Sequence, residues 1–156
     1  MEGHKYVPWK EVRTWRCIRC GKCCNIFSIP LTLGEAFNIT RKYGPVVVNK
    51  GGKFLLISKF NGDCIFLERR NGRAYCTIYP ERPFVCRIYP FYIKLRPLRK
   101  SKKSEALYEC EDGLEVYVYL DMTCEGIEKG GHFIEDLVPK AAVSYTHLTL
   151  PTICSV

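Results

Sequence analysis

Four cysteines lie within eight residues near the start of the chain, at Cys17, Cys20, Cys23 and Cys24. Two Cys-x-x-Cys steps follow one another, and this spacing lets successive thiolates point at one soft metal ion from a tight turn. Gly21, inside the run, supplies the backbone freedom that such a turn often needs. The spacing therefore predicts a metal-binding protein that uses thiolate ligands.

Further cysteines continue the pattern along the chain. The predicted metal ligands are Cys17, Cys20, Cys23, Cys24, Cys64, Cys76, Cys86 and Cys124. Zinc takes four sulfur ligands in a tetrahedron, and iron–sulfur clusters such as 4Fe-4S are also held by four thiolates. The sequence leaves both cofactors open, although the three-cysteine run and the many aromatic residues favour a cluster. Adjacent Cys23 and Cys24 do not easily serve one tetrahedral ion, so one centre and two centres both remain open.

A disulfide-rich secreted protein is the rival interpretation, because the chain has ten cysteines, an even number. The N-terminal residues lack the apolar segment of a secretory signal. No stretch approaches the roughly 20 apolar residues of a membrane span. We therefore expect a cytoplasmic protein, in which thiols stay reduced and available to metals.

The formal net charge of +8 is weak evidence for a polyanionic partner. Metal-bound cysteines are thiolates, so eight ligands and two divalent ions would lower the charge to about +4. A basic run spans residues 94–103. It is either a site for RNA or an acidic protein, or a solvated extension of a hairpin.

The residue patterns predict an α+β fold, a small single domain of β-hairpins and short helices organised around Cys-ligated metal centres. Residues 1–13 are expected to form an N-terminal arm, residues 14–140 the metal-binding domain, and residues 141–156 a non-native tail. The tail loses the charged character of the rest and resembles read-through from a vector, so Cys154 is left out of the chemistry.

Local signals place the first helix at residues 33–43. Thr32 and Glu35 form a capping-box pattern, and Gly44 with the following proline ends the helix. Leu33 and Phe37, together with Ala36 and Ile39, are expected to line its apolar face.

Strand signals follow at residues 53–59, 64–70, 73–79 and 91–95. The Asn-Gly pair at residues 71–72 predicts a two-residue hairpin that pairs Leu67 with Cys76 and Cys64 with Tyr79. Cys64 and Cys76 would then lie on opposite faces, and could share one ion only if a bulge or a strand end intervenes. A turn or short helix is expected at residues 79–86.

A last hairpin is expected at residues 106–110 and 114–120, turning at Asp112 and Gly113. Apolar residues alternate along its second strand, which predicts a sheet with one covered face. A final helix is expected to begin near Phe133.

Several of these motifs, in order, resemble one known family. They are the run at residues 17–24, Cys64, the block from Cys76 through Tyr79, Arg82, Pro83 and Cys86 to Phe91, and the segment from Cys124 to Gly130. Together they resemble the CxxCxxCC cysteine-cluster family, described as a zinc- or iron-chelating domain. Glu125 stands where that family usually has proline. The family includes a flagellin lysine methylase with additional sequence, so the resemblance mainly implies metal binding.

Arg82 and Arg87 bracket Cys86 and are the candidate cofactor-binding residues. Their guanidinium groups either lower thiolate basicity or receive an anionic ligand, or else Arg82 bridges a carboxylate to fix the turn. Three functions follow from the sequence. They are a cluster that supports electron or methyl transfer, a zinc-stapled binding module for RNA or an acidic protein, and a metal store or chaperone. No residue pattern identifies the chain as an enzyme.

Overall fold

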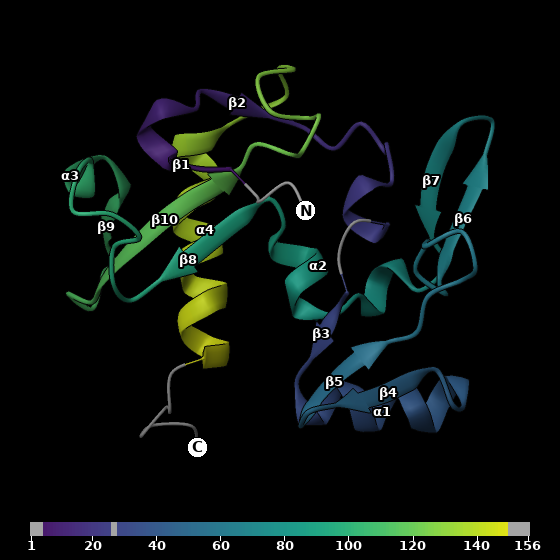
Figure 1. Cartoon of the computed structure of the whole chain (residues 1–156). Helices are drawn as coiled ribbons and strands as arrows, with labels where there is room; N and C mark the ends of the chain where they lie inside the picture. The colour runs from purple at the N-terminus through teal and green to yellow at the C-terminus, as the bar shows by residue number, and fades with distance from the viewer. Residues whose placement is uncertain (1–4, 26–27, 150–156) are drawn as a thin grey trace. The chain divides into compact units, whose positions relative to one another are not determined.

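The computed structural model describes residues 5–25 and 28–149 and divides the chain into two compact units (Figure 1). We call residues 1–18 with 90–156 the terminal unit, and residues 19–89 the central unit. Helices and antiparallel sheets occur in both, so the fold is α+β, as predicted. The expected single domain at residues 14–140 stays a prediction.

The sheet of the terminal unit is built around β10 (Glu115–Asp121). β1 (Tyr6–Pro8), β8 (Phe91–Lys94) and β9 (Leu107–Glu109) each pair with β10 in antiparallel orientation. β2 (Thr14–Trp15) pairs with β11 (His132–Phe133), and a short 3-10 helix, η1 (Trp9–Glu11), follows β1. Part of the expected N-terminal arm is therefore a strand of this sheet.

Two helices complete the terminal unit, α3 (Lys103–Ala106) and α4 (Ile134–Thr149). α4 contacts both β8 and β10 (Figure 1) and contributes fully buried Ile134 and Val138. α4 begins where the sequence predicted a helix, and it continues through buried Ala141 into the expected tail. The non-native origin of that tail stays a prediction.

Both faces of β10 are covered, which corrects the prediction of a single covered face. The last hairpin is otherwise as predicted, with Glu115 paired with Glu109. Val116, Val118 and Leu120 are fully buried, and Tyr117 and Tyr119 on the opposite face are nearly so. The tyrosine rings pack with Ala106 of α3 and with Tyr6 and Tyr92, a covering that the alternation pattern does not reveal.

In its described residues, the central unit contains two α-helices, two short 3-10 helices and two sheets. Its elements are η2 (Lys22–Cys24), β3 (Pro30–Leu31), α1 (Leu33–Tyr43), β4 (Val47–Lys50), β5 (Lys53–Leu56), β6 (Leu67–Arg70), β7 (Arg73–Cys76), η3 (Tyr79–Glu81) and α2 (Phe84–Ile88). One sheet has the order β3-β5-β4 and the other is the β6-β7 hairpin. The expected strand at residues 53–59 thus ends early, at Leu56.

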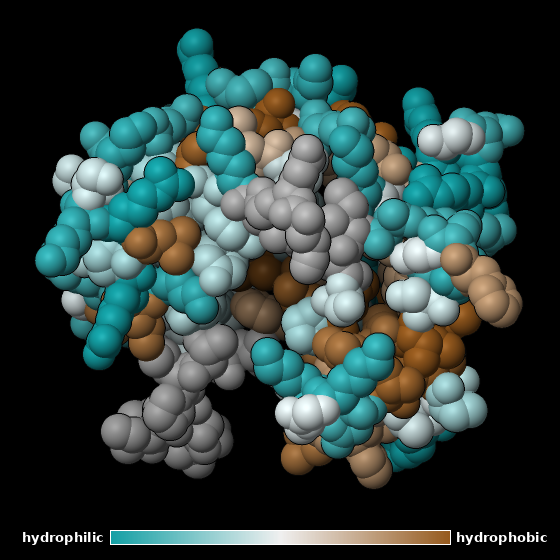
Figure 2. Space-filling model, in the orientation of Figure 1, coloured by the Kyte–Doolittle hydropathy of each residue, from teal (hydrophilic) through white to brown (hydrophobic). Residues whose placement is uncertain are grey.

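α1 forms where the capping signals placed it, and two of the four residues predicted for its apolar face are buried. Ala36 and Ile39 are buried, whereas Leu33 and Phe37 are 72% and 65% exposed. Figure 2 shows hydrophobic residues gathered on the surface of the central unit, at the lower right of the view. The helical period alone could not decide which apolar residues of the helix would be buried in the core.

Glu35 joins the first turn of α1 to α2. Its Oε1 accepts a hydrogen bond from the Thr32 amide at 3.0 Å, completing the capping box. Its Oε2 accepts one from the Phe84 amide at 2.6 Å. One carboxylate therefore fixes the start of two helices, and α2 carries Cys86.

Replacing Glu35 with alanine should lower the free energy of unfolding by about 1–2 kcal/mol, because two amides lose their acceptor. Urea unfolding of the full chain measures this change. Thr40→Ala, at an exposed position on the same helix, is the control and should change stability little. Equal effects of the two substitutions would contradict the assigned role of Glu35.

Candidate metal centre

Gly21 shapes the cysteine run, as predicted. It has φ +78°, caps η2, and its carbonyl accepts a hydrogen bond from the Cys24 amide at 3.1 Å. A Cβ at this position would lie 2.9 Å from Cβ of Ala74 in β7, too close for an ordinary contact. Both the turn and the neighbouring hairpin therefore require glycine here.

Cys64 is held directly against this turn. Its amide donates to the Cys24 carbonyl at 2.6 Å, and the residue is only 7% exposed. β6 begins at Leu67, which pairs with Cys76 as predicted, but the expected pairing of Cys64 with Tyr79 is wrong. β6 begins after Cys64, so Cys64 is not part of the strand and the alternation of faces does not separate it from Cys76.

Cys76 and Cys86 reach the same core from two other elements. Cys76 is the last residue of β7, and Cys86 lies in α2, which begins after Pro83. Their half-buried side chains pack, with that of Cys24, against the apolar cluster that includes Cys64. The cysteines come from four separate segments and surround one apolar core.

The sulfur atoms of this group affect one another electrostatically. Cys23 Sγ and Cys24 Sγ are 4.0 Å apart, and this contact lowers the pKa of Cys23 to about 7 while raising that of Cys24. Burial, and then the charges of Cys23, Cys64 and Cys76, raises the pKa of Cys86 to about 12. Burial also raises the pKa values of Cys64 and Cys76.

Closely spaced thiolates in an apolar core repel one another unless a cation neutralises them. The charges of Cys64 and Cys86 each raise the pKa of Cys24 as well. A bound metal ion reverses this balance, because it favours deprotonated ligands. The donor chemistry of the central unit therefore fits zinc or iron.

The eight predicted ligands are divided between the two units. Cys20, Cys23, Cys24, Cys64, Cys76 and Cys86 belong to the central unit, and Cys17 and Cys124 to the terminal unit. Cys20 is half-buried, and its carbonyl accepts a hydrogen bond from Arg69 Nη1 at 3.3 Å. Within residues 5–25 and 28–149, no three His, Cys, Asp or Glu side chains are already arranged to hold a metal ion. The nine cysteines described are all free of disulfides.

Cys124 begins a turn in the terminal unit, and Cys17 is exposed. The indole Nε1 of Trp15 donates to Cys124 Sγ at 3.2 Å. The Arg16 amide donates to the Gly126 carbonyl at 3.1 Å. A Cβ on Gly126 would overlap the Arg16 carbonyl oxygen, so this turn requires glycine.

Gly126→Ala should therefore destabilise the terminal unit by about 2 kcal/mol, because the backbone of Arg16 must move away. Thermal unfolding followed by circular dichroism measures the effect. Gly34→Ala is the control, because nothing lies near its Cβ position, and it should leave the melting temperature unchanged. Gly113→Ala is less suited, because Gly113 has a positive φ that a side chain would strain. An unchanged melting temperature for Gly126→Ala would show that the turn tolerates a side chain.

Asp63 is a site residue that the sequence did not identify. It is 3% exposed, and its carboxylate accepts hydrogen bonds from Arg69 Nε and Nη2, both at 3.0 Å, and from Asn25 Nδ2 at 2.8 Å. Arg69 is the main cause that lowers the pKa of Asp63 to about 2. The turn pattern at residues 61–63 was visible in the sequence, but the distant partners were not. Asn25 follows Cys24 and Asp63 precedes Cys64, so this hydrogen-bond network links the two segments that carry these cysteines.

Of the two predicted cofactor-binding residues, Arg82 and Arg87, the charge of Arg82 acts on the cysteine group of the central unit. Arg82 Nε donates to the Tyr79 carbonyl at 3.1 Å, and its guanidinium lies over the Tyr79 ring at 3.9 Å. Its charge lowers the pKa values of Cys23, Cys76 and Cys86. Arg87 is exposed.

The basic run at residues 94–103 belongs to the terminal unit, and part of it is bound there. Lys102 pairs with Glu11 at 2.7 Å, and Arg99 donates to the Tyr6 carbonyl at 3.1 Å. Lys94 lies over the Tyr92 ring. The pair with Glu11 neutralises the charge of Lys102, whereas the contacts of Arg99 and Lys94 leave their positive charges in place.

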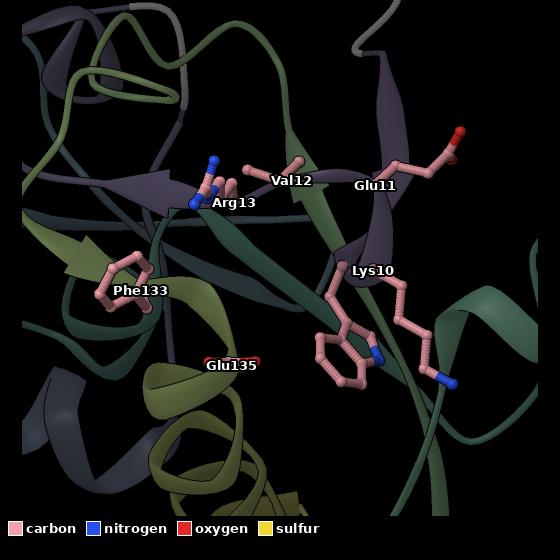
Figure 3. A pocket seen from close by; sticks show the side chains of 7 residues that line it. Lys10, Glu11, Val12, Arg13, Phe133 and Glu135 are labelled. Carbon is pink, nitrogen blue, oxygen red and sulfur yellow. The ribbon is translucent and has the colours of Figure 1, made fainter.

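The terminal unit also contains a cavity of about 710 Å³ (Figure 3). Trp9, Arg13, Phe133 and Glu135 are among the residues that line it, and no cysteine is. The cavity is therefore not part of the thiol chemistry. No described helix has the length and apolar character needed to cross a membrane.

Comparison with known proteins yields one family and one curated relative. The CxxCxxCC family, described as "Putative zinc- or iron-chelating domain", matches residues 16–125. An uncharacterized protein of Methanocaldococcus jannaschii is 26% identical over 88 residues, which cover 53% of this chain and 47% of the relative. The chain thus spans about half the length of that relative. No solved structure is a significant match.

Proposed function

Because the chain belongs to the CxxCxxCC family of zinc- or iron-chelating domains, we propose that the central unit holds a metal centre through its cysteines. The observation that carries this proposal is that Cys24, Cys76 and Cys86, from three separate segments, pack against the apolar cluster that contains Cys64. Either cofactor needs four thiolates, and the central unit supplies six with Cys20. Cys17 and Cys124 stay predicted ligands.

We propose an iron–sulfur cluster, of the 4Fe-4S type, in preference to zinc. The three-cysteine run at Cys17, Cys20 and Cys23 supports a cluster, as does the apolar surrounding of Cys64 and Cys86. When bound, such a cluster supplies one-electron chemistry. The protein's part is to exclude water and to place Arg82, whose positive charge favours the thiolate forms nearby. We also propose a cytoplasmic location, where thiols stay reduced and available to metals.

Anaerobic purification of the full chain, followed by an absorption spectrum and assays for iron, zinc and acid-labile sulfide, tests the proposal. A broad band near ~400 nm with iron and sulfide supports the cluster. A colourless protein with stoichiometric zinc would contradict the cluster and support a zinc-stapled binding module instead. Weak, variable and exchangeable metal would instead indicate a store or chaperone. A chain without any metal would overturn the proposal.

A further inference from the structure

The central unit also contains a cavity that no cysteine lines, although it includes Arg82 and Arg87. This cavity of about 510 Å³ lies between α1 and the segment formed by η3 and α2. Four cationic residues line it, Arg41 and Lys42 from α1, Arg82 after η3, and Arg87 from α2. Two carboxylates, Glu35 and Glu81, also line it. Its volume lies in the range of sites for small ligands, about 300–1,000 Å³.

Both carboxylates are already used within the protein. Glu35 accepts hydrogen bonds from the amides of Thr32 and Phe84. Glu81 is paired with Lys42 and accepts a hydrogen bond from the Tyr43 hydroxyl at 3.1 Å. The hydrogen bond from Lys42 lowers the pKa of Glu81, so that carboxylate stays ionised and bound to Lys42. Among the described residues, neither carboxylate forms an ion pair with an arginine of the cavity.

Most N–H groups of the three arginines in the cavity make no hydrogen bond among the described residues. Arg82 uses Nε for the Tyr79 carbonyl, and no bond to its two terminal nitrogens is present among the described residues. In the same part of the chain, Arg41 and Arg87 have no carboxylate partner. Guanidinium groups with free donors match the oxygens of an anion, particularly by paired hydrogen bonds.

We propose that this cavity binds the phosphate group of a small phosphomonoester. Four cations and two anions line the cavity, which leaves two positive charges, the charge that a phosphate dianion neutralises. Ile39, which is buried, also lines the cavity and gives the organic part of the ligand an apolar surface. Asn38 adds an amide that can bind a further oxygen. The proposal rests on the cavity and its charges and does not depend on the metal centre.

Calorimetric titration of the full chain at constant ionic strength tests the site, with phenyl phosphate, inorganic phosphate and benzoate as probes. Both phosphates should bind, and benzoate should bind at least about tenfold more weakly, because it carries one charge. The double variant R41Q/R87Q should weaken phenyl phosphate binding by about 100-fold or more, since two charge-assisted interactions are lost.

The matched control is K53Q/R73Q, which removes the same charge from two exposed positions of the central unit. It should change phenyl phosphate affinity by less than about twofold, because exposed charges far from a ligand are screened. Equal weakening in both double variants, benzoate binding as tight as that of phenyl phosphate, or no phosphate binding by the wild-type chain would each overturn the proposal. Metal content should not differ between the single variant R41Q and wild type, because Arg41 of α1 has no assigned role at the metal centre. Failure of the phosphate site can therefore be told apart from failure of the metal centre.

Discussion

Cys64→Ser should remove most of the bound metal from the purified chain and lower its melting temperature. Cys64 is buried, and its charge raises the pKa of Cys24. Its backbone amide also donates a hydrogen bond to the Cys24 carbonyl. Metal binding to a structural thiolate site contributes about 10–16 kcal/mol in small zinc domains, and loss of one ligand of four removes a large part of that. Elemental analysis and thermal unfolding, made on the same preparation, measure the two losses.

Cys110→Ala is the matched control for this substitution. Cys110 is a half-buried free cysteine of the terminal unit and lies outside the motifs. It should keep full metal content. Cys76→Ser provides a second test at a less buried thiol, where misfolding is a smaller concern. Full metal content in both serine variants would exclude Cys64 and Cys76 as ligands.

Asp63→Ala should lower the free energy of unfolding by about 3 kcal/mol, because the buried carboxylate holds Arg69, Asn25 and Asn61. Removal of one partner from a buried ion pair costs about 3–5 kcal/mol, and the 42% exposure of the Arg69 side chain places this pair at the low end. Urea unfolding of the full chain measures the change. Metal content should fall as well, since the network joins the segments that carry Cys24 and Cys64.

Glu68→Ala is the control, because Glu68 pairs with Arg70 on the surface of the same hairpin. Exposed pairs contribute little to stability, so this variant should unfold like the wild-type chain. If Asp63→Ala proved as stable as Glu68→Ala, the Asp63 network would have no structural role.

Elements defined by short-range chemistry were predictable from the sequence. The capping box of Thr32 and Glu35 placed α1 at its first residue, and the Asn-Gly pair fixed the register that joins Leu67 to Cys76. Such signals involve residues three or four positions apart, or a turn that sets the pairing of its own strands. The family motifs were recognisable for the same reason, because they are local in sequence.

Features that depend on distant partners were not predictable. The exposure of Phe37 and the burial of Tyr117 depend on which other element covers each face. Asp63 resembled an ordinary turn residue because Asn25 lies 38 positions away. The eight ligand assignments remain predictions for the same reason, since ligand geometry is set by the tertiary fold and by the ion itself.

The double use of Glu35 has a consequence for dynamics. Because its two oxygens bind the amides of Thr32 and Phe84, a fluctuation that releases either helix start leaves the other without part of its support. The two amides should therefore exchange hydrogen with solvent as one cooperative unit. A ligand bound to Cys86 that stabilises α2 should therefore also slow hydrogen exchange in the first turn of α1. The exchange rate of the Thr32 amide would then report binding at Cys86 from another helix.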